Sequence, residues 1–432
     1  MEINKTKGKI NMYKVVEVTN RNLLKKFVNF PLKLYKDCPF YVPELFSDEM
    51  KNLNPKKSVY MTDGTAECKC FLCFKDDEVV ARACGIVSKL YNEKTNSKRI
   101  RLSRFDSIDD IEPAKLVVEA VENWGRSLGL DTIHGPLDFT DMGREGMLIE
   151  GFDYMATFET QYNYPYYKKL IEQLGYQKEV DWLGYLVQVP STPDSRNERM
   201  SKLVAKRTKV HEVEIKSNKW LIKNYFDQIF DLIDETYSSL YGTIPVTENV
   251  RKSLLNQFKL ILDKDFISLL ADENDKLVGF ALALPSIAQA VQKSKGKLFP
   301  VGWARVLHSL HHVNMIDLSL IGIKQEYRDT GIIALMYHSL LTNFCKRKVK
   351  IADTNVQLED NIKSIRLMDI YSPKFKCRRR CYVKSLDGKE IKFHKAITKR
   401  PKEKVESPHQ TESQKETQTE IITENKDEQP NT

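Results

Sequence analysis

The sequence predicts an α/β protein in which one series of elements occurs twice, forming a mixed sheet with helices on both faces. Strand-like and helix-like hydrophobic patterns alternate along the chain, and the order of these patterns repeats. A joint at residues 190–199, rich in Ser, Pro, Asp and Asn, separates the two halves. With 432 residues, of which 41% are hydrophobic, the chain is long enough for two or three domains with cores of their own.

The composition excludes several classes of protein. No apolar run approaches the ~20 residues that a membrane-spanning helix needs, and the first residues lack the apolar segment of a secretory signal. Eight cysteines are too sparse for a disulfide scaffold. The net charge of +9 includes no dense basic stripe interleaved with aromatic residues. We therefore expect a soluble cytoplasmic protein with no membrane span and no DNA partner.

The first half, residues 1–190, contains the elements of one mixed sheet. Its clearest helix is 113–128, because Pro113 lies in its first turn and Gly129 follows its end. Residues 68–74 and 78–88 predict a hairpin across a polar turn. The other expected strands are 12–18, 100–105, 132–134 and 180–189, and the other expected helices are 22–36 and 165–174.

The second half, residues 200–394, repeats this order after an insertion ahead of residue 315. The expected strands are 209–215, 266–271, 276–284, 315–323, 350–355 and 376–384, and the expected helices are 220–241, 247–262, 331–346 and 361–371. From residue 395 onward Glu, Lys, Gln, Thr, Pro and Asn dominate. Such a segment buries too little apolar surface to offset its conformational entropy, so residues 395–432 are predicted to be a disordered tail.

The most informative local pattern lies between Ile316 and Gly331. An apolar strand ends in a short polar turn, and a helix begins at Gly331. Unpaired amides and the positive end of the helix dipole favour an anion, and a glycine lets a phosphate approach the backbone closely. Because many plain connections share this pattern, it alone leaves open whether a phosphate binds.

Here the residues resemble the GNAT acyltransferase superfamily, whose pyrophosphate loop reads Gln/Arg-x-x-Gly-x-Gly/Ala. The run Arg328-Asp329-Thr330-Gly331-Ile332-Ile333 follows this pattern, except that Ile333 takes the last small position and Ala334 comes next. The resemblance implies acetyl-CoA or another acyl-CoA as co-substrate. The residues that it implies for binding this coenzyme are Ile323, Arg328, Asp329, Thr330, Gly331, Ile332, Ile333, Ala334 and Asn361.

A second resemblance covers about residues 27–384. Segments in the same order occur in a bacterial family of tandem GNAT-like proteins called YghO-like; they include Tyr41-Val42-Pro43, Gly135-Pro136, Gly146–Phe152, Tyr162–Tyr167 and Gly296–Trp303. This resemblance implies two tandem GNAT-like domains. The first domain lacks the phosphate loop, because the acidic run 106–112 stands in its place and would repel pyrophosphate.

A GNAT-type enzyme brings an amine against an acyl thioester, so it needs a base for the ammonium and often a tyrosine as acid. Asp317 is the candidate base, because burial in its apolar strand would raise its pKa; the alternative is a strand-edge carboxylate that faces water. Tyr371 is the candidate acid, or else a tyrosine that packs beneath Pro373. Asn361 is a helix N-cap or a coenzyme contact.

The first half contains a long glycine-bearing loop at 135–143, followed by a tyrosine-rich run. Loops of this kind often carry binding residues. We expect the loop to close over the acceptor, with Asn163, Tyr166 and Tyr167 lining it. Buried tyrosines with satisfied hydroxyl groups would explain the same residues equally well.

We expect no metal site. The spacing of Cys68, Cys70, Cys73 and Cys84 is not that of a zinc knuckle, and packing in an apolar strand is favoured. The histidines at 308, 311 and 312 have helical spacing but no accompanying carboxylate, which favours an exposed or interfacial helix face.

The sequence therefore predicts an N-acyltransferase that moves an acyl group from acyl-CoA to a small-molecule or peptide amine. Catalysis is expected in the second domain, with the first domain shaping the acceptor pocket. Two alternatives stay open: a tandem GNAT protein that uses an aminoacyl-tRNA donor, and a GNAT-fold binding protein without catalysis. Neither the acceptor, nor the acyl length, nor the oligomeric state follows from the sequence.

Overall fold

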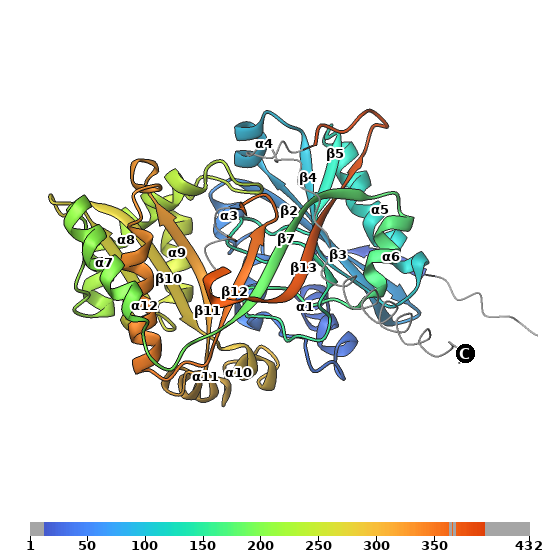
Figure 1. Cartoon of the computed structure of the whole chain (residues 1–432). Coiled ribbons are helices and arrows are strands. Elements are labelled where there is room, and N and C mark those ends of the chain that lie inside the picture. The colour runs from blue at the N-terminus through green and yellow to red at the C-terminus, as the bar shows by residue number, and fades with distance from the viewer. Residues whose placement is uncertain (1–12, 363–364, 366–368, 394–432) are drawn as a thin grey trace, which may run out of the picture. The chain divides into compact units, whose positions relative to one another are not determined.

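One continuous mixed sheet runs through the computed structural model of the chain (Figure 1). The structure describes residues 13–362, 365 and 369–393, and thirteen strands of this part form the sheet. The predicted tail at 395–432 lies outside the described residues, as does part of the helix predicted at 361–371. The predicted α/β class with a mixed sheet is confirmed.

The elements of the first half follow the predicted order. They are β1 (Tyr13–Glu17), α1 (Arg21–Leu34), α2 (Phe46–Asn52), α3 (Val59–Thr62), β2 (Ala66–Lys75), β3 (Glu78–Ser88), α4 (Lys89–Thr95), β4 (Arg99–Ser107), α5 (Ile111–Ser127), β5 (Thr132–Gly135), β6 (Met147–Glu150), α6 (Tyr166–Gln173) and β7 (Gln177–Gln188). Helix α5 begins where the Asp110 carboxylate accepts the Glu112 amide. Its apolar stripe, which includes Val117, Val118 and Val121, is buried.

The second half repeats the series. It contains α7 (Ser195–Thr208), β8 (His211–Glu212), α8 (Asn218–Tyr237), α9 (Glu248–Phe258), η1 (Lys264–Phe266), β9 (Ile267–Ala271), β10 (Leu277–Pro285), α10 (Ala288–Lys293), α11 (Gly302–His311), β11 (Met315–Ile323), η2 (Gln325–Tyr327), α12 (Ile333–Lys346), β12 (Ile351–Leu358), η3 (Asp369–Tyr371) and β13 (Lys374–Ser385).

The joint between the halves differs from the prediction, because helix α7 starts inside it. The Asp194 side chain caps the helix by accepting the Arg196 amide, and Val204 is buried. The strand expected at 209–215 is correspondingly short, since only His211–Glu212 pairs with β9.

The two halves exchange strands at the centre of the sheet. The strand order is β1-β2-β3-β4-β5-β13-β7-β12-β11-β10-β9-β8, and β6 pairs with β13. Strand β13, from the end of the second half, therefore lies between β5 and β7 of the first half, and β7 pairs with β12. Figure 1 shows β7 and β13 side by side in the middle of the structure.

Each half contains one parallel strand pair at the same point of its series. Strands β4 and β5 are parallel, as are β11 and β12. A parallel pair needs a crossover connection, which α5 provides in the first half and α12 in the second. The repeat that the sequence predicts is thus present in the topology.

Helices cover both faces of the sheet. Along β10, Phe280 packs into a core cluster with residues of α8, whereas its neighbour Ala281 packs into another cluster with residues of α12. Alternate strand residues point to opposite faces, so α8 and α12 lie on opposite sides. None of the helices in the described part of the chain is both long and apolar enough to cross a membrane.

Candidate active site

In the second half, the parallel strands β11 and β12 stop pairing with each other before either strand ends. Their register ends with Asp317 opposite Asp353, although β11 runs on to Ile323 and β12 to Leu358. Directly after this point β11 contains a bulge: Leu320 and Leu318 pair with successive residues of β10, and Ser319 between them has no partner there. Bulges redirect side chains and are frequent beside active sites. The end of the pairing is therefore the first candidate position for chemistry.

Glu159, in a loop of the first half, bridges this split between the strands. Its carboxylate oxygens accept hydrogen bonds from the Ser319 hydroxyl of β11 at 2.8 and 2.7 Å. The side-chain amide of Asn355, in β12, donates a hydrogen bond to the same carboxylate at 2.5 Å. Sequence reasoning missed Glu159, because no local pattern links a loop residue to a strand 160 positions away.

The loop that carries Glu159 is held by its own hydrogen bonds. The Thr160 amide donates to the Thr157 carbonyl at 3.3 Å, and the Thr157 amide donates to the Thr160 hydroxyl at 3.0 Å. Both threonines are buried, and the Thr157 hydroxyl also donates to the Asn355 side chain at 3.1 Å. Threonine hydroxyls stabilise such turns, so the position of Glu159 is determined before any ligand binds.

Two buried carboxylates lie behind Glu159. Asp353 forms an ion pair with Lys376 of β13. It also accepts a hydrogen bond from the backbone amide of Asn355 at 3.0 Å. Asp317 is only 3% exposed, and its Oδ1 atom has no hydrogen-bond partner among the described residues. Asp317 is thus buried in its strand and does not face water at a strand edge. This burial is what the hypothesis of a catalytic base requires.

This arrangement raises the pKa of the Asp317 and Glu159 carboxyl groups. Burial, followed by the negative charges of Asp353 and Glu159, raises the pKa of Asp317 well above its ordinary value. Burial also raises the pKa of Glu159, and the hydrogen bonds from Ser319 and Asn355 oppose this in part. A carboxylate with a raised pKa is a stronger base when ionised, so Glu159 and Asp317 are the two candidate bases.

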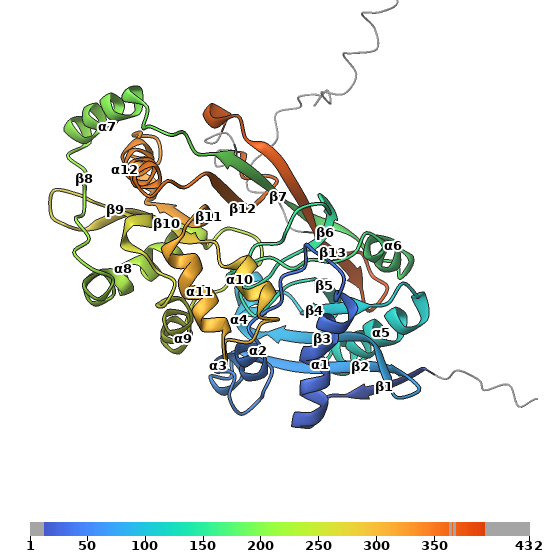
Figure 2. The ribbon, with the colours of Figure 1, turned by 90° about the horizontal axis from the view of Figure 1, so that it is seen from below.

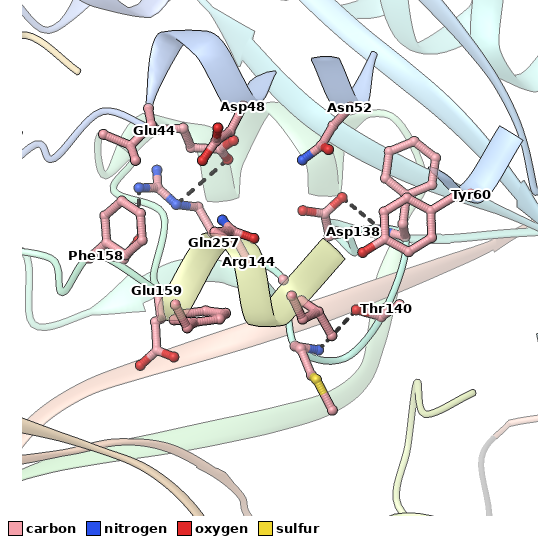
Figure 3. A pocket seen from close by; sticks show the side chains of 16 residues that line it. Glu44, Asp48, Asn52, Tyr60, Asp138, Thr140, Arg144, Phe158, Glu159 and Gln257 are labelled. Carbon is pink, nitrogen blue, oxygen red and sulfur yellow. Dashed lines mark hydrogen bonds and ion pairs between the residues drawn. The ribbon is translucent and has the colours of Figure 1, made fainter. Parts of the chain in front are cut away.

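A cavity of about 70 Å³ opens beside Glu159 (Figure 3). Its charged lining residues are four acids and one base, namely Glu44, Asp48, Asp138, Glu159 and Arg144. The other lining residues come from α2 and the residue before it, from α3, from the loops after β5 and β6, and from α9 of the second half; they are Leu45, Asn52, Tyr60, Phe139, Thr140, Met142, Gly143, Phe158, Leu254, Gln257 and Phe258. The excess of carboxylates suits a positively charged ligand.

Arg144 joins the two walls of this cavity. Its guanidinium donates to the carbonyl oxygens of Val42 at 3.1 Å and of Phe158 at 3.0 Å, and it lies 3.6 Å from the Glu44 carboxylate. Burial raises the pKa of Glu44 and of Asp48. Arg144 therefore links the segment that precedes α2 with Phe158, the residue before Glu159.

The predicted phosphate loop lies at the start of α12. Gly331 has φ +86°, and the amides of Gly331 and Ile332 make no hydrogen bond within the described residues. A Cβ atom on Gly331 would lie 3.8 Å from the Arg207 guanidinium of α7. Unpaired amides at a helix start and a nearby guanidinium fit a phosphate group.

The comparisons with known proteins agree with this geometry. No family model matches the chain. Protein YghO of Escherichia coli (strain K12) is 27% identical over 351 residues, which cover 79% of this chain and 87% of that protein. A solved tandem GNAT protein from the clavulanic acid biosynthesis pathway superposes with a TM-score of 0.51 at 10% identity, covering 88% of this chain and 100% of that one.

This chain has the tandem GNAT fold and is similar in sequence to protein YghO. The YghO-like chain is also 22% identical over 322 residues to the bacterial ceramide synthase of Caulobacter vibrioides (strain NA1000 / CB15N). That match covers 73% of this chain and 81% of the synthase. The fold class that the sequence predicts is thus confirmed, and the division into domains at residues 190–200 stays a prediction.

The other predicted coenzyme residues surround the loop. The Ile323 carbonyl accepts from the Arg328 side chain at 3.2 Å, and the Thr330 carbonyl accepts from Arg207. Arg328 and Asp329 are exposed, and Ile332 is fully buried. Ile333 and Ala334 are half-buried in the first turn of α12. Coenzyme binding by these residues stays a prediction.

Tyr371 lies close to the helices around this loop, and Asn361 lies close to the end of β12. The Tyr371 hydroxyl accepts from the Asn197 side chain of α7 at 3.2 Å, and its ring packs edge-on against Tyr337 of α12. Burial raises the pKa of Tyr371, so its hydroxyl keeps a proton that it can donate. The Asn361 carbonyl accepts the Ile365 amide at 3.2 Å, as in the first turn of a helix. Neither functional role is decided by these contacts.

The expected acceptor loop lines the cavity with Asp138, Phe139, Thr140, Met142 and Gly143. The three residues expected to bind the acceptor make contacts elsewhere. Asn163 bonds the backbone of Leu148, Tyr166 donates to the Ser107 carbonyl at 2.7 Å, and Tyr167 lies buried against Asp106 and Tyr35. Their hydroxyl and amide groups are satisfied within the fold, so acceptor binding by them stays a prediction.

Three of the four cysteines converge in the hairpin of β2 and β3. The Sγ atoms of Cys68, Cys70 and Cys84 lie within 4.8 Å of one another, and Cys73 packs into a different cluster. Burial raises the pKa of Cys84, whereas the hydrogen bonds with Cys68 and Cys84 lower the pKa of Cys70. His308, His311 and His312 lie on α11 or at its end and are exposed.

Proposed function

We propose that the YghO-like chain is an N-acyltransferase that moves an acyl group from acyl-CoA to an amine. The observation that carries this proposal is the position of Glu159. Glu159 lines an acid-rich cavity, and its carboxylate bonds both strands where β11 and β12 separate. One residue thus connects a site suited to an ammonium group with the open part of the GNAT sheet.

The chain's own residues account for the handling of the amine. At neutral pH an amine arrives as its ammonium form, which the acidic side chains around the cavity attract when they are ionised. Glu159 accepts a proton from this ammonium at one of its oxygens, which frees the nitrogen lone pair for attack. The hydrogen bonds from Ser319 and Asn355 orient the carboxylate throughout. Because the carboxylate is buried, its raised pKa makes this transfer more favourable than for an ordinary glutamate.

The residues at the start of α12 fit the coenzyme that the fold implies. The amides of Gly331 and Ile332, together with Arg207, would hold its pyrophosphate. When bound, acyl-CoA supplies the thioester that the amine attacks. Ile333, half-buried in the first turn of α12, places a branched side chain where the GNAT loop has a small residue, so we assign the contact to the amides that precede it.

The acceptor that we propose is a long-chain amine. The relative from Caulobacter vibrioides is a ceramide synthase, and a ceramide is the amide of a fatty acid with a long-chain amino alcohol. The cavity has room for a small polar head group, and Leu45, Met142 and Phe258 provide apolar walls for the start of a chain. A tRNA donor requires a basic channel, whereas this cavity is acidic.

A direct assay tests the proposal. The purified chain is incubated with acetyl-CoA or palmitoyl-CoA and with either sphinganine or ethanolamine; free thiol is measured over time and the amide product is identified by mass spectrometry. An amide of sphinganine that the Glu159→Gln variant fails to make supports both the reaction and the acceptor class. Amide formed only with ethanolamine contradicts the long-chain acceptor. No amide with either donor contradicts the acyltransferase.

A further inference from the structure

The insertion between β10 and β11 carries a concentration of exposed apolar side chains. Phe299 is 81% exposed, Val301 54%, Trp303 49% and Leu307 44%. These are four of the ten large hydrophobic side chains that are exposed in the described part of the chain. A cluster of this kind marks an interaction surface far more often than isolated exposed residues do. We call these four residues the α11 patch.

Helix α11 is apolar on two sides, and only one side is covered. Val306 and Leu310 pack against the large core cluster of the first half. Trp303 and Leu307 are one helical turn apart and lie on the outer side. Figure 2 shows α11 beside α10 on the side of the structure that faces the viewer.

The insertion is attached firmly to the first half. The Phe46 amide donates to the Gly296 carbonyl at 2.8 Å, and the Gln292 side chain donates to the carbonyl oxygens of Pro39 and Tyr41 at 2.9 Å. The α11 patch is therefore presented on a fixed support, so docking it costs little conformational entropy.

Positive charge surrounds this apolar surface. The sequence contains no Asp or Glu from Ser286 to Ile316, although acids and bases are mixed elsewhere. The basic residues of this stretch are Lys293, Lys295, Lys297 and Arg305, and all four are exposed. The Arg305 guanidinium donates to the Lys293 carbonyl at 2.8 Å, which keeps it beside the lysines.

We propose that the α11 patch binds the surface of a bilayer that contains anionic lipids. Tryptophan and phenylalanine partition into the boundary between head groups and acyl chains, and nearby lysine and arginine side chains are attracted to anionic head groups. A second copy of the chain is a poorer occupant, because a symmetric contact would bring both sets of basic residues together.

The α11 patch lies next to a route toward the candidate active site. Lys295 lines a second, smaller cavity together with Glu44 and Arg144, and these two residues also line the cavity at Glu159. A long-chain amine that is held in a bilayer would thus reach Glu159 from the docked side. This last step rests on the proposed function, whereas binding to the bilayer does not.

Co-sedimentation with vesicles tests the docking. The full chain is mixed with vesicles of phosphatidylcholine alone or of about three parts phosphatidylcholine to one part phosphatidylglycerol. We expect binding to the anionic vesicles that weakens at high salt. The double variant Phe299→Ser/Trp303→Ser and the double variant Lys293→Glu/Lys297→Glu should each lower the binding constant roughly tenfold or more.

A matched control uses two exposed leucines outside the insertion. Leu203 is 65% exposed and Leu260 is 70% exposed, so Leu203→Ser/Leu260→Ser removes similar apolar surface elsewhere and should leave vesicle binding unchanged. Circular dichroism verifies that every variant folds. Absence of binding by the unaltered chain overturns the proposal, and so does equal loss in the control variant. Dimers that the Phe299→Ser/Trp303→Ser change dissolves would assign the patch to a second copy instead.

Acyl transfer to sphinganine dispersed in detergent, in the absence of vesicles, separates this inference from the proposed function. The patch variants should retain that activity, because neither Phe299 nor Trp303 lines the cavity at Glu159. If the chain binds anionic vesicles but transfers no acyl group, the docking surface stands and the enzymatic proposal falls. If it transfers acyl groups but binds no vesicle, the reverse holds.

Discussion

The Ser319 hydroxyl of β11 donates to both carboxylate oxygens of Glu159, at 2.8 and 2.7 Å. Ser319 is the bulged residue of its strand, and Glu159 belongs to a loop of the other half. This contact makes the candidate site a property of both halves together. Neither half alone contains the split strands, the acid-rich cavity and the carboxylate that joins them.

Replacing Glu159 by glutamine keeps the shape of the side chain and removes the base. We expect kcat for acyl transfer to fall about 10²- to 10⁴-fold, because proton acceptance from the ammonium is lost. The affinity for acyl-CoA, measured by calorimetry, should remain. Glu235→Gln, on the exposed side of α8, is the matched control and should behave like the unaltered chain. Equal rates in all three proteins would remove Glu159 from the mechanism.

The stability of the fold should depend on pH through Asp317. Its pKa is raised in the folded state, so between the ordinary pKa and the raised one the folded chain holds a proton that the unfolded chain has lost. Stability from this group is fully present below the ordinary pKa and is lost as pH rises through that window. Asp317→Asn should therefore raise Tm more at pH 8 than at pH 5. A change that is the same at both pH values would show that Asp317 is ionised in the folded state.

The buried pair of Asp353 and Lys376 should respond differently. Lys376→Met leaves the Asp353 carboxylate, which is 0% exposed, without its cation. We expect the free energy of unfolding to fall by about 3–5 kcal/mol, because an unpaired buried charge is costly. The double variant Asp353→Asn/Lys376→Met should recover most of this loss in urea unfolding. No recovery would mean that packing, and not charge pairing, accounts for the effect.

Binding of the coenzyme should depend on the loop at Gly331. Gly331→Glu places a negative charge where a phosphate is expected, so the affinity for acetyl-CoA and for free CoA should fall roughly a hundredfold or more. Gly129→Glu is the matched control, since Gly129 also has positive φ, at +71°, and has open space around it. Calorimetry measures both variants. Loss of binding in both would point to backbone strain and not to a phosphate site.

Filling the cavity should affect the acceptor and spare the coenzyme. Met142 lines the cavity, so Met142→Trp should raise KM for the amine roughly tenfold, because overpacking a filled site costs 1–3 kcal/mol. The KM for acyl-CoA should stay unchanged. Met200→Trp adds the same side chain at a position that is 53% exposed and serves as the control. An increase in both KM values for Met142→Trp would indicate a general distortion.

Several features were predictable because they depend on neighbouring residues. The hairpin of β2 and β3 and the capped helix α5 both follow from local periodicity and turn chemistry. The sequence left open whether Asp317 is buried or faces water, and the structure shows it buried. Helix α7 was missed, since the Asp194 cap stands inside a segment whose composition is typical of a linker. A helix forms in this segment because Asp194 caps its start and Val204 packs into a core cluster of the second half.

The exchange of β7 and β13 and the place of Glu159 were not predictable in this way. Each depends on which distant strands pair, and a single strand pattern is compatible with many partners. The contacts of Tyr167 with Asp106 and Tyr35 illustrate the same limit, because the neighbouring residues in the sequence do not indicate them. A hydroxyl in an apolar run bonds whatever the final packing brings to it.

The sequence by itself determined that this chain folds as two similar α/β units, with a glycine at a helix start in the second and an acid in its central strand. These features are local, because hydrogen bonding and hydrophobic spacing within a few residues specify them. Only the tertiary structure decided that Glu159 reaches Ser319 across 160 positions, that the cavity beside it is acidic, and that the α11 patch lies uncovered among basic residues. Those properties depend on long-range packing. It brings together residues that are far apart in the sequence, and the local sequence around each residue does not indicate its partner.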